Sequence, residues 1–450
     1  MRRIFLFSAV TCFGIDGMLF ICYNKRMIQE KRGFTMIKFC VLLLLLMEGA
    51  YKIVLSVIRY RSADNPTPAS VGDIYDAETY LRWKRYHAEH CRLEIICHSI
   101  SLAVAFLLLA TDAYAAVAAL FWEWEISAAL VLYFLADYVI SLFKRYISVM
   151  VIEEKYGFNR STKMTFFTDS VMQAVYEFGL LFILSEFMFL SHFLAGDWMP
   201  FVVAVFYFLF SLLLSYMSSK HGRRSKTNTY TPLAEGELKD KLTALLHKYG
   251  FRIKAIEVVD ASRRTTKLNA YIAGLGKAKT IVLFDNMLQA MDTDEICAVF
   301  AHELGHGLHK DILKRNLLNI GYMLLFGAVA YLSVFEPAVY WAFGFDYVDY
   351  GFACVLFGIG MGILQPLTGS VFNAVFRRQE CRADAFSANE GLGKTLISAL
   401  KKMAKDNFTH LSPSPVNVFF EYTHPPIHLR IEAIEQEIQM ITVYEKGDLI

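Results

Sequence analysis

The 450-residue sequence lacks a large net charge, a close cysteine pair, internal repeats and low-complexity tracts. Its formal net charge of +2 gives no electrostatic basis for binding nucleic acid. The 8 cysteines are scattered without a CxxC pair, which argues against a disulfide framework or a thiolate metal site and favours free thiols. No small-residue cleavage pattern follows the first apolar run, so a removed signal peptide is not expected.

Apolar residues are abundant instead. They make up 55% of the chain and gather in long runs rather than on amphipathic faces. A helix needs about 20 such residues to cross the hydrocarbon core of a bilayer. Seven runs reach this length, at 37–58, 97–121, 126–143, 168–192, 199–217, 317–336 and 350–371. A weaker run at 4–22 is an eighth span, an uncleaved signal anchor, or sequence upstream of a later start at Met27 or Met36.

Lysine and arginine predict the orientation of these spans. Both residues are frequent at 59–96, 144–167, 218–316 and 372–450, and both are absent from the alternate segments 122–125, 193–198 and 337–349. A topology of seven spans with an outer N-terminus and a cytoplasmic C-terminus places every segment rich in lysine and arginine in the cytoplasm. It places every segment without them on the outer side. The predicted organisation is therefore an extra apolar segment (1–33), five spans with cytoplasmic loops 59–96 and 144–167 (34–217), a cytoplasmic domain (218–316), two spans (317–371) and a cytoplasmic tail (372–450).

The stretch HELGH places His302 and His306 four residues apart, with Glu303 directly after the first. Asp292 and Glu295 upstream have the spacing of a capping box, and the apolar periodicity that follows predicts a helix. On a helix the two histidines share one face and can bind one Zn²⁺, with the glutamate beside them as general base toward water. The stretch predicts a zinc hydrolase site.

A third ligand should come from a separate element, followed one turn later by an acid that orients a ligand histidine. Glu380 and Asp384, in RRQECRADAF, are again four residues apart and fit this pattern. The alternative is an ordinary charged helix face, on which Glu380 pairs with Arg377 or Arg378. Because the stretch occurs together with HELGH, we prefer the interpretation as ligand and orienting acid.

Three other histidines have no comparable pattern. His309 lies close after His306, but the zinc already has its partners, so we interpret His309 as solvated. His87 and His90 are expected in a loop without a carboxylate partner, and we assign them no ligand role.

With these residues in hand, the chain resembles the type 1 CAAX prenyl protease family, which are integral-membrane zinc endopeptidases. HELGH alone is moderately specific, whereas EEKYGFN, NAY, ECRAD and HPP together are highly specific. The family's seven spans agree with the hydropathy of this chain. The matching stretches occur in the family's order from about residue 70 to 435, as VIEEKYGFNRST (151–162), LNAYIAGLGKAKTIVLFDNML (268–288), AHELGH (301–306), RRQECRADAF (377–386) and THPP followed by Arg430.

The resemblance implies a role for each matching residue. His302, His306 and Glu380 would bind zinc, Glu303 would be the base and Asp384 the acid behind the ligands. Asn269, Ala270 and Tyr271 would lie on an edge strand that pairs with an extended substrate, which agrees with the alternation of that segment. His424 would donate a hydrogen bond to the tetrahedral oxyanion, with Arg430 supporting it.

The resemblance also implies a large water-filled chamber between the membrane helices. Ionisable residues inside the predicted spans give partial support, because such groups face a cavity or a partner. The alternative is hydrogen bonding between helices by protonated acids. The residues concerned are Glu48, Asp112, Asp137, Glu177 and Glu186.

We therefore predict a mainly α-helical, multi-pass membrane protein with seven or eight transmembrane helices around a chamber. A cytoplasmic, zincin-like α+β metalloprotease domain would accompany them. The segment before residue 34 departs from the family pattern. The terminal EKGDLI has neither a dilysine nor a KDEL-type signal, which favours a bacterial inner membrane over the endoplasmic reticulum. The zinc domain would face the cytoplasm in either membrane.

The predicted function is a zinc-dependent membrane endopeptidase of the CAAX-processing type, with one Zn²⁺ per chain. It would hydrolyse an extended substrate, a peptide or lipidated protein, near the cytoplasmic membrane face, in contact with membrane lipids and without nucleic acid. An alternative that uses the same site is a quality-control protease for membrane proteins with no prenyl requirement. A non-catalytic chamber protein with structural zinc is disfavoured, because a structural site needs no base such as Glu303.

Overall fold

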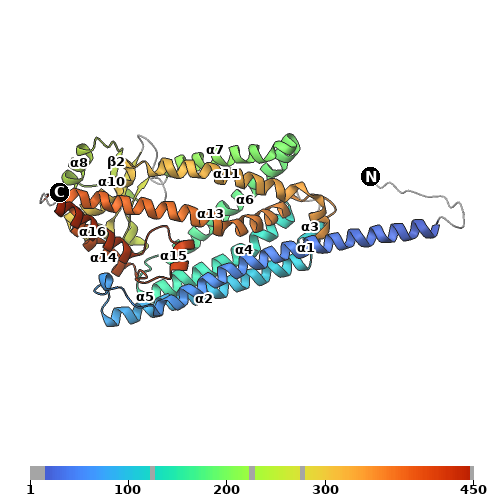
Figure 1. Cartoon of the computed structure of the whole chain (residues 1–450), viewed down its shortest axis with the longest axis horizontal. Helices are drawn as coiled ribbons and strands as arrows, with labels where there is room; N and C mark the ends of the chain where they lie inside the picture. Colours follow the sequence, from blue (N-terminus) through green and yellow to red (C-terminus); the bar gives the residue numbers. More distant parts are fainter. Residues whose placement is uncertain (1–15, 122–126, 222–228, 274–278, 446–450) are drawn as a thin grey trace.

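The computed structural model describes residues 16–121, 127–221, 229–273 and 279–445, with side chains over 33–121, 127–213, 229–272 and 279–443. Much of the apolar run at 4–22 lies outside this part of the chain. The end of that run begins a continuous helix, α1 (Asp16–Arg61). The N-terminal part of α1 projects beyond the neighbouring helices (Figure 1). The status of residues 1–33 stays as predicted, with its alternatives.

Long apolar helices form most of the described chain, because a helix satisfies its own backbone hydrogen bonds and needs none from lipid. Within the described residues, all seven predicted runs lie mainly in helices. The run at 97–121 is broken at Asp112, whose φ of 56° lies in the left-handed region. The helices are α1, α2 (Ala77–Ala110), α3 (Ala113–Leu120), α4 (Ala128–Tyr146), α6 (Lys163–Ala195), α7 (Met199–His221), α11 (Asp311–Phe335) and α13 (Tyr350–Ser387).

The described chain has five helical segments that are long and apolar enough to cross a membrane. One of them contains both α6 and α7. Charged residues along α4, among them Asp137 and Lys144, make that helix more polar. The five segments establish a membrane protein, and the total of seven or eight spans stays a prediction. They are Gly33–Asp64, Ala77–Ala110, Lys163–Leu213, Asp311–Phe335 and Tyr350–Asp406.

Several helices run past the boundaries drawn from composition. α7, α11 and α13 continue across residues 217, 316 and 371, because a helix can leave the apolar layer without ending. The segments 59–96 and 144–167, predicted as loops, are also largely helical. The first contains the start of α2, and the second contains a π-helical turn (Ile147–Glu153) and α5 (Glu154–Tyr156). The hydropathy of these segments did not indicate that they are helical.

A small sheet lies at the end of the bundle opposite α3 (Figure 1). Its 4 strands are ordered β1-β2-β4-β3, with β2 and β4 parallel and both outer pairs antiparallel. β3 (Ala270–Ala273) is an outermost strand, while the central β4 (Thr280–Phe284) is almost fully buried. The other strands are β1 (Tyr230–Pro232) and β2 (Ala255–Val259).

Shorter helices surround the sheet at this end of the molecule, next to the C-terminal part of α13 (Figure 1). Their apolar faces share one core with the sheet, to which Ile281 and Leu283 of β4 contribute fully buried side chains. The helices are α8 (Glu237–Lys248), α9 (Asp285–Ala290), α10 (Thr293–Leu308), α14 (Gly393–Asp406) and α16 (Ile427–Glu445). α15 (Pro415–Glu421) packs against α13 and α1 instead, and α12 (Pro337–Ala342) lies between α11 and α13 in the sequence.

The helix that carries HELGH begins as the sequence predicts. The Asp292 side chain accepts a hydrogen bond from Glu295 N over 2.8 Å, and the Glu295 side chain accepts one from Asp292 N over 3.1 Å. This reciprocal capping box satisfies two backbone donors at the start of α10. Lys402 binds Glu295 Oε2 over 2.6 Å and thereby connects the start of α10 to α14.

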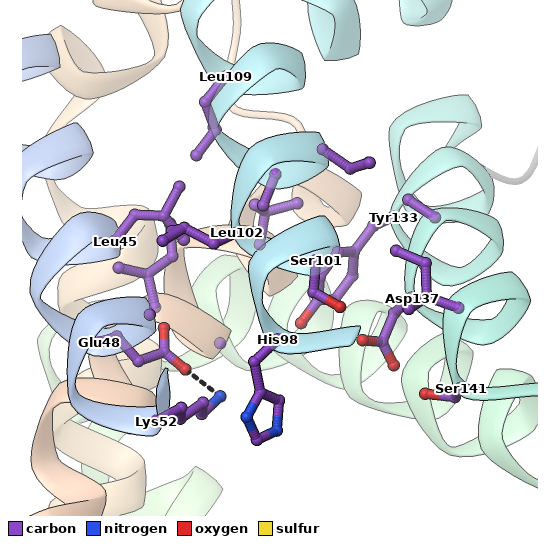
Figure 2. Close-up of a pocket in the computed structure, with 18 of the residues that line it drawn as sticks. Leu45, Glu48, Lys52, His98, Ser101, Leu102, Leu109, Tyr133, Asp137 and Ser141 are labelled. Atoms are coloured by element: carbon purple, nitrogen blue, oxygen red, sulfur yellow. Dashed lines mark hydrogen bonds and ion pairs between the residues drawn. The ribbon is translucent and has the colours of Figure 1, made fainter. Parts of the chain in front are cut away.

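Two cavities lie between the membrane helices. The first measures about 350 Å³ and is polar on one side, where Lys52 binds Glu48 over 2.6 Å. Figure 2 shows this pair on α1 beside His98 of α2, with Asp137 on α4. The second measures about 490 Å³ and is mainly aromatic, with Asp137 and Glu177 in its lining. Three of the five ionisable groups predicted within the spans thus face cavities.

The other two behave differently. Asp112 binds Lys38 over 2.7 Å and so has a partner on a neighbouring helix. Glu186 is exposed on the surface of the protein. The ion pairs of Asp112 and Glu48 with lysines are not the bonding between protonated acids considered as the alternative, and the water-filled chamber stays a prediction.

Candidate metal centre

Two histidines of α10 and a glutamate of α13 converge on one point. His302 Nε2 lies 3.4 Å from Glu380 Oε2, and His306 Nε2 lies 3.2 Å from Glu380 Oε1. One ligand atom from each residue lies within 4.8 Å of the others. The structure therefore brings together the three residues predicted to bind zinc, although they come from two helices.

The donor set and its spacing fit a zinc ion. Two imidazole nitrogens and a carboxylate oxygen leave one tetrahedral position open, as in catalytic zinc sites. With zinc–ligand bonds of about 2.0–2.1 Å, two tetrahedral ligand atoms lie roughly 3.3 Å apart. The separations from the imidazoles to Glu380, 3.4 Å to Oε2 and 3.2 Å to Oε1, are of this size, although each runs to a different carboxylate oxygen. Glu380 is only 3% exposed, so its buried charge requires a cation or strong donors beside it.

Asp384, one turn after Glu380, holds the other ring nitrogen of His302. Its Oδ1 lies 2.8 Å from His302 Nδ1. Arg430 donates from Nε and Nη2 to the two oxygens of Asp384, over 2.8 and 2.7 Å. This fork fixes the carboxylate and, through it, the orientation of the imidazole. Burial opposes a charged ring, but Asp384 and Glu380 outweigh it and raise the pKa of His302 to about 9. The surroundings of His302 therefore suit a cation.

A second orienting acid, Asp311, was missed by the sequence analysis. Its Oδ2 lies 3.0 Å from His306 Nδ1, and its side chain is 1% exposed. Arg382 binds the other oxygen of Asp311 over 3.0 Å. Lys310, just before Asp311, has a φ of 55°, and this left-handed turn brings the start of α11 back to His306. The five-residue spacing from His306 matches no helical repeat, so no periodicity pointed to Asp311.

We expect Asp311→Asn to weaken zinc binding by about 10- to 100-fold, because the amide holds the ring of His306 less firmly and makes it less basic. Competition with a chromogenic chelator measures this affinity. Asp73→Asn, which removes only a surface ion pair with Lys401, is the matched control and should leave the affinity unchanged. Equal zinc affinities for Asp311→Asn and the wild type would show that Asp311 does not orient the ligand.

Glu303 completes the motif on α10. It is partly exposed, and its charge interacts with those of His302, His306 and Glu380. Burial raises the pKa of Glu303, while the two imidazoles act in the opposite direction. A carboxyl group with a raised pKa beside metal ligands is suited to exchanging protons near neutral pH.

His424 lies beside the cluster, just before α16. Its Nδ1 is 2.7 Å from Glu380 Oε2, yet its side chain is 62% exposed. Pro425 and Pro426 follow and restrict the backbone that presents the ring. His424 is therefore next to the ligands and accessible to a bound molecule.

The NAY segment lies at the edge of the sheet. Asn269 is exposed and directly precedes β3, in which Ala270 is buried and Tyr271 is half-buried. The ring of Tyr271 contacts Phe284 on β4. The edge strand expected here is present, and the role of these residues toward substrate stays a prediction.

Three other histidines, His309, His87 and His90, do not belong to the cluster of metal ligands. His309 closes the C-terminal end of α10. His87 and His90 lie on α2 and not in a loop, because Asp76 caps that helix and the helix continues through both. His90 Nε2 also lies 3.6 Å from Glu153, a carboxylate that no sequence pattern indicated.

Two family models match most of the chain. The model of peptidase family M48 matches residues 232–438, which contain the metal ligands and every other residue of this site. The model described as the CAAX prenyl protease N-terminal region with five membrane helices matches residues 56–221.

Individual relatives give the same assignment. The CAAX prenyl protease 1 homologue of Arabidopsis thaliana is 30% identical over 300 residues, which cover 64% of this chain and 68% of the relative. The homologue of Oryza sativa is 28% identical over 444 residues, covering 88% and 96%. The crystal structure of S. mikatae Ste24p shares the fold, with a TM-score of 0.78 at 23% identity, covering 88% of this chain and 98% of that chain. The chain therefore belongs to the CAAX prenyl protease 1 family, within the membrane metalloproteases of peptidase family M48.

Proposed function

We propose that this protein is a zinc-dependent endopeptidase of the CAAX-processing type that cuts an extended peptide at the membrane surface. The observation that carries the proposal is the cluster of His302, His306 and Glu380, with Glu303 on the same helix as the two histidines. The substrate class is supported by relatives that are named CAAX prenyl proteases. A CAAX sequence is a C-terminal motif whose cysteine carries a prenyl lipid.

Each residue around the cluster has a separate role in peptide hydrolysis. Zinc, when bound to the three ligands, supplies a Lewis acid that activates water and polarises the scissile carbonyl. Glu303 accepts a proton from the attacking water and passes it to the departing amine nitrogen. His424 donates a hydrogen bond to the oxyanion that develops on the carbonyl. Arg430 and Asp384 together hold the ring of His302 in place.

The substrate binds as an additional strand. β3 is an outermost strand of the sheet, and α10, which carries HELGH, packs against it. An extended peptide that pairs with β3 along Asn269, Ala270 and Tyr271 therefore passes close to the metal ligands. Backbone pairing accepts many sequences, so specificity has to come from side-chain pockets or from the lipid.

The end of the molecule that holds the metal ligands faces the cytoplasm in this proposal. Support comes from the lysine and arginine residues of 59–96, 144–167, 218–316 and 372–450, which the positive-inside rule assigns to that side. The same orientation applies in a bacterial inner membrane and in the endoplasmic reticulum membrane.

The test compares two classes of substrate. The purified protein, loaded with zinc in liposomes, is expected to cleave a farnesylated CAAX peptide with a kcat/KM about tenfold or more above that of the unlipidated peptide, because burial of the lipid adds binding free energy. Chelation of zinc should abolish both reactions. Mass spectrometry identifies the cleaved bond.

A destabilised membrane protein serves as the second substrate class. Selective cleavage of this protein, with no effect of the lipid on peptide cleavage, would favour the quality-control alternative. The Glu303→Gln form measures the background from contaminating proteases. If the wild type cleaves no substrate above this background, the protein is not the proposed endopeptidase.

A further inference from the structure

The ring of His424 needs support from the backbone to stay beside the metal ligands. Its side chain is 62% exposed, so packing of the ring against neighbours holds it only weakly. Pro425 and Pro426 follow directly and restrict the backbone, and Pro425 also restricts the conformation of His424 itself. The position of this short segment is therefore set by its two ends, one at α15 and the other at α16.

The first end of the segment is bonded to α13. A helix leaves its last four carbonyl groups without partners inside the helix. At the end of α15, Arg377 Nη1 donates to Val418 O over 2.8 Å and to Tyr422 O over 2.7 Å. Asn373, also on α13, donates from Nδ2 to Phe420 O over 2.8 Å. Tyr422 lies two residues before the histidine, so these bonds fix the backbone that leads into it.

The other end of the segment is bonded to the same helix. Arg430 of α16 donates two hydrogen bonds to Asp384 of α13, and its own N–H donates to Pro426 O over 3.1 Å. Between these two attachments, His424 Nδ1 lies 2.7 Å from Oε2 of the metal ligand Glu380. α13 therefore carries both attachments of the segment and the ligand that the segment faces.

The residues of α13 that make these contacts lie on one face of the helix. Asn373, Arg377, Glu380 and Asp384 follow one another at spacings of four, three and four residues, which places them in one row. Arg377, considered above as an ion-pair partner of Glu380, bonds the end of α15 with its Nη1 instead. This row sets the distance between the metal ligand and the backbone that carries the histidine.

α15 is also held by α1, through side chains of α15. Asn417 Nδ2 donates to Leu55 O over 2.9 Å, and Glu421 forms an ion pair with Arg59. The bonds from Arg377 fall instead on the final carbonyl groups, where the chain leaves α15 toward the metal ligands. Removing Arg377 is therefore expected to leave α15 in place and to release mainly its C-terminal end.

We propose that Arg377 is a positioning residue, which holds His424 where it can donate a hydrogen bond to the oxyanion. The inference rests on the proposed function and adds a residue that acts through His424 and not on the substrate. A donor stabilises a developing oxyanion only when it is already at the right distance. A displacement of about 1 Å can reduce a rate by roughly 100-fold. Loss of the Arg377 bonds should therefore lower kcat, while zinc binding and KM stay close to those of the wild type.

The experiment is a double-mutant cycle on Arg377 and His424, with cleavage of a farnesylated CAAX peptide by the purified, zinc-loaded protein. We expect Arg377→Gln to lower kcat by about tenfold or more, with KM and zinc content near the wild-type values. His424→Ala should lower kcat by about 10²- to 10³-fold. Adding Arg377→Gln to His424→Ala should lower kcat by less than about twofold further, because the ring that Arg377 positions is already absent.

Two further variants and a control separate positioning from a general loss of structure. Arg377→Lys should restore most of kcat, because one nitrogen makes both bonds in the wild type and an ammonium group has enough hydrogens for both. Asn373→Ala removes the single bond to Phe420 O. It should lower kcat less than Arg377→Gln does, again only when His424 is present, and it tests the inference if Arg377→Gln does not fold. Arg378→Gln removes the same charge at the next, exposed position and should keep the wild-type kcat.

Three results would overturn the inference. Arg377→Gln could keep the wild-type kcat, could raise KM or lose zinc with no fall in kcat, or could lower kcat by the same factor with and without His424. A wild-type kcat for His424→Ala would contradict the role of this histidine in the proposed function, and the inference with it. An equal loss in both backgrounds would contradict only the positioning role of Arg377.

Discussion

Replacing Glu303 with Gln is expected to lower kcat by about 10²- to 10⁴-fold while zinc stays bound. The amide has nearly the size of the carboxylate but cannot accept a proton from water. The three ligands His302, His306 and Glu380 remain in place, so the metal content should not change. KM should change little, because in the proposed binding mode the substrate strand pairs with β3 and not with Glu303.

Steady-state cleavage of a fluorogenic CAAX peptide, together with the zinc content per chain from plasma mass spectrometry, measures both effects. Glu295→Gln is the matched control on the same helix. It weakens the capping box and the ion pair with Lys402, so it should lower the melting temperature while leaving kcat unchanged below the unfolding transition. A Glu303→Gln form with bound zinc and wild-type kcat would mean that another group is the base.

The second large effect is expected for Glu380→Ala, which should reduce the bound zinc from about one ion per chain toward none after dialysis. Two imidazoles from one helix then remain as the only protein ligands of the cluster. The loss of activity should follow the loss of zinc. High zinc concentrations should restore little activity, because the remaining site lacks the charge and the third position of Glu380.

Glu390→Gln provides the control for this variant. Glu390 lies ten residues further along and binds Lys248 over 2.7 Å, away from the ligands. This variant should keep both zinc and activity. Full zinc occupancy in Glu380→Ala at low zinc concentration would show that a different group supplies the third ligand.

The helix with HELGH was predictable in detail because its signals are local. The capping box at Asp292 and Glu295 and the shared face of His302 and His306 depend only on spacing along one helix. The same rule placed Glu380 and Asp384 on one face of α13. Glu380 was preferred as the third ligand because its stretch occurs together with HELGH, and the structure brings it to the two histidines.

Contacts between residues of different helices or loops were not predictable from spacing along the sequence. Asp311 reaches His306 through a left-handed turn at Lys310, and Arg382 reaches Asp311 from α13, 71 residues away in sequence. Asn407 meets Leu268 across 139 residues. Each of these contacts follows from how the helices pack, which no repeat in the sequence records.

The sequence by itself determined the apolar runs that became membrane helices, the start of α10, and the two i, i+4 pairs that carry the metal ligands and the acid behind them. These features follow from composition and from the period of a single helix. Only the tertiary structure decided that α13 presents Glu380 to α10, that Asp311 and Arg430 support the ligands, and that Asn407 bonds the backbone of Leu268 ahead of β3. The physical reason is that such contacts depend on the packing of distant segments against one another, and buried polar groups need partners wherever the fold brings them together.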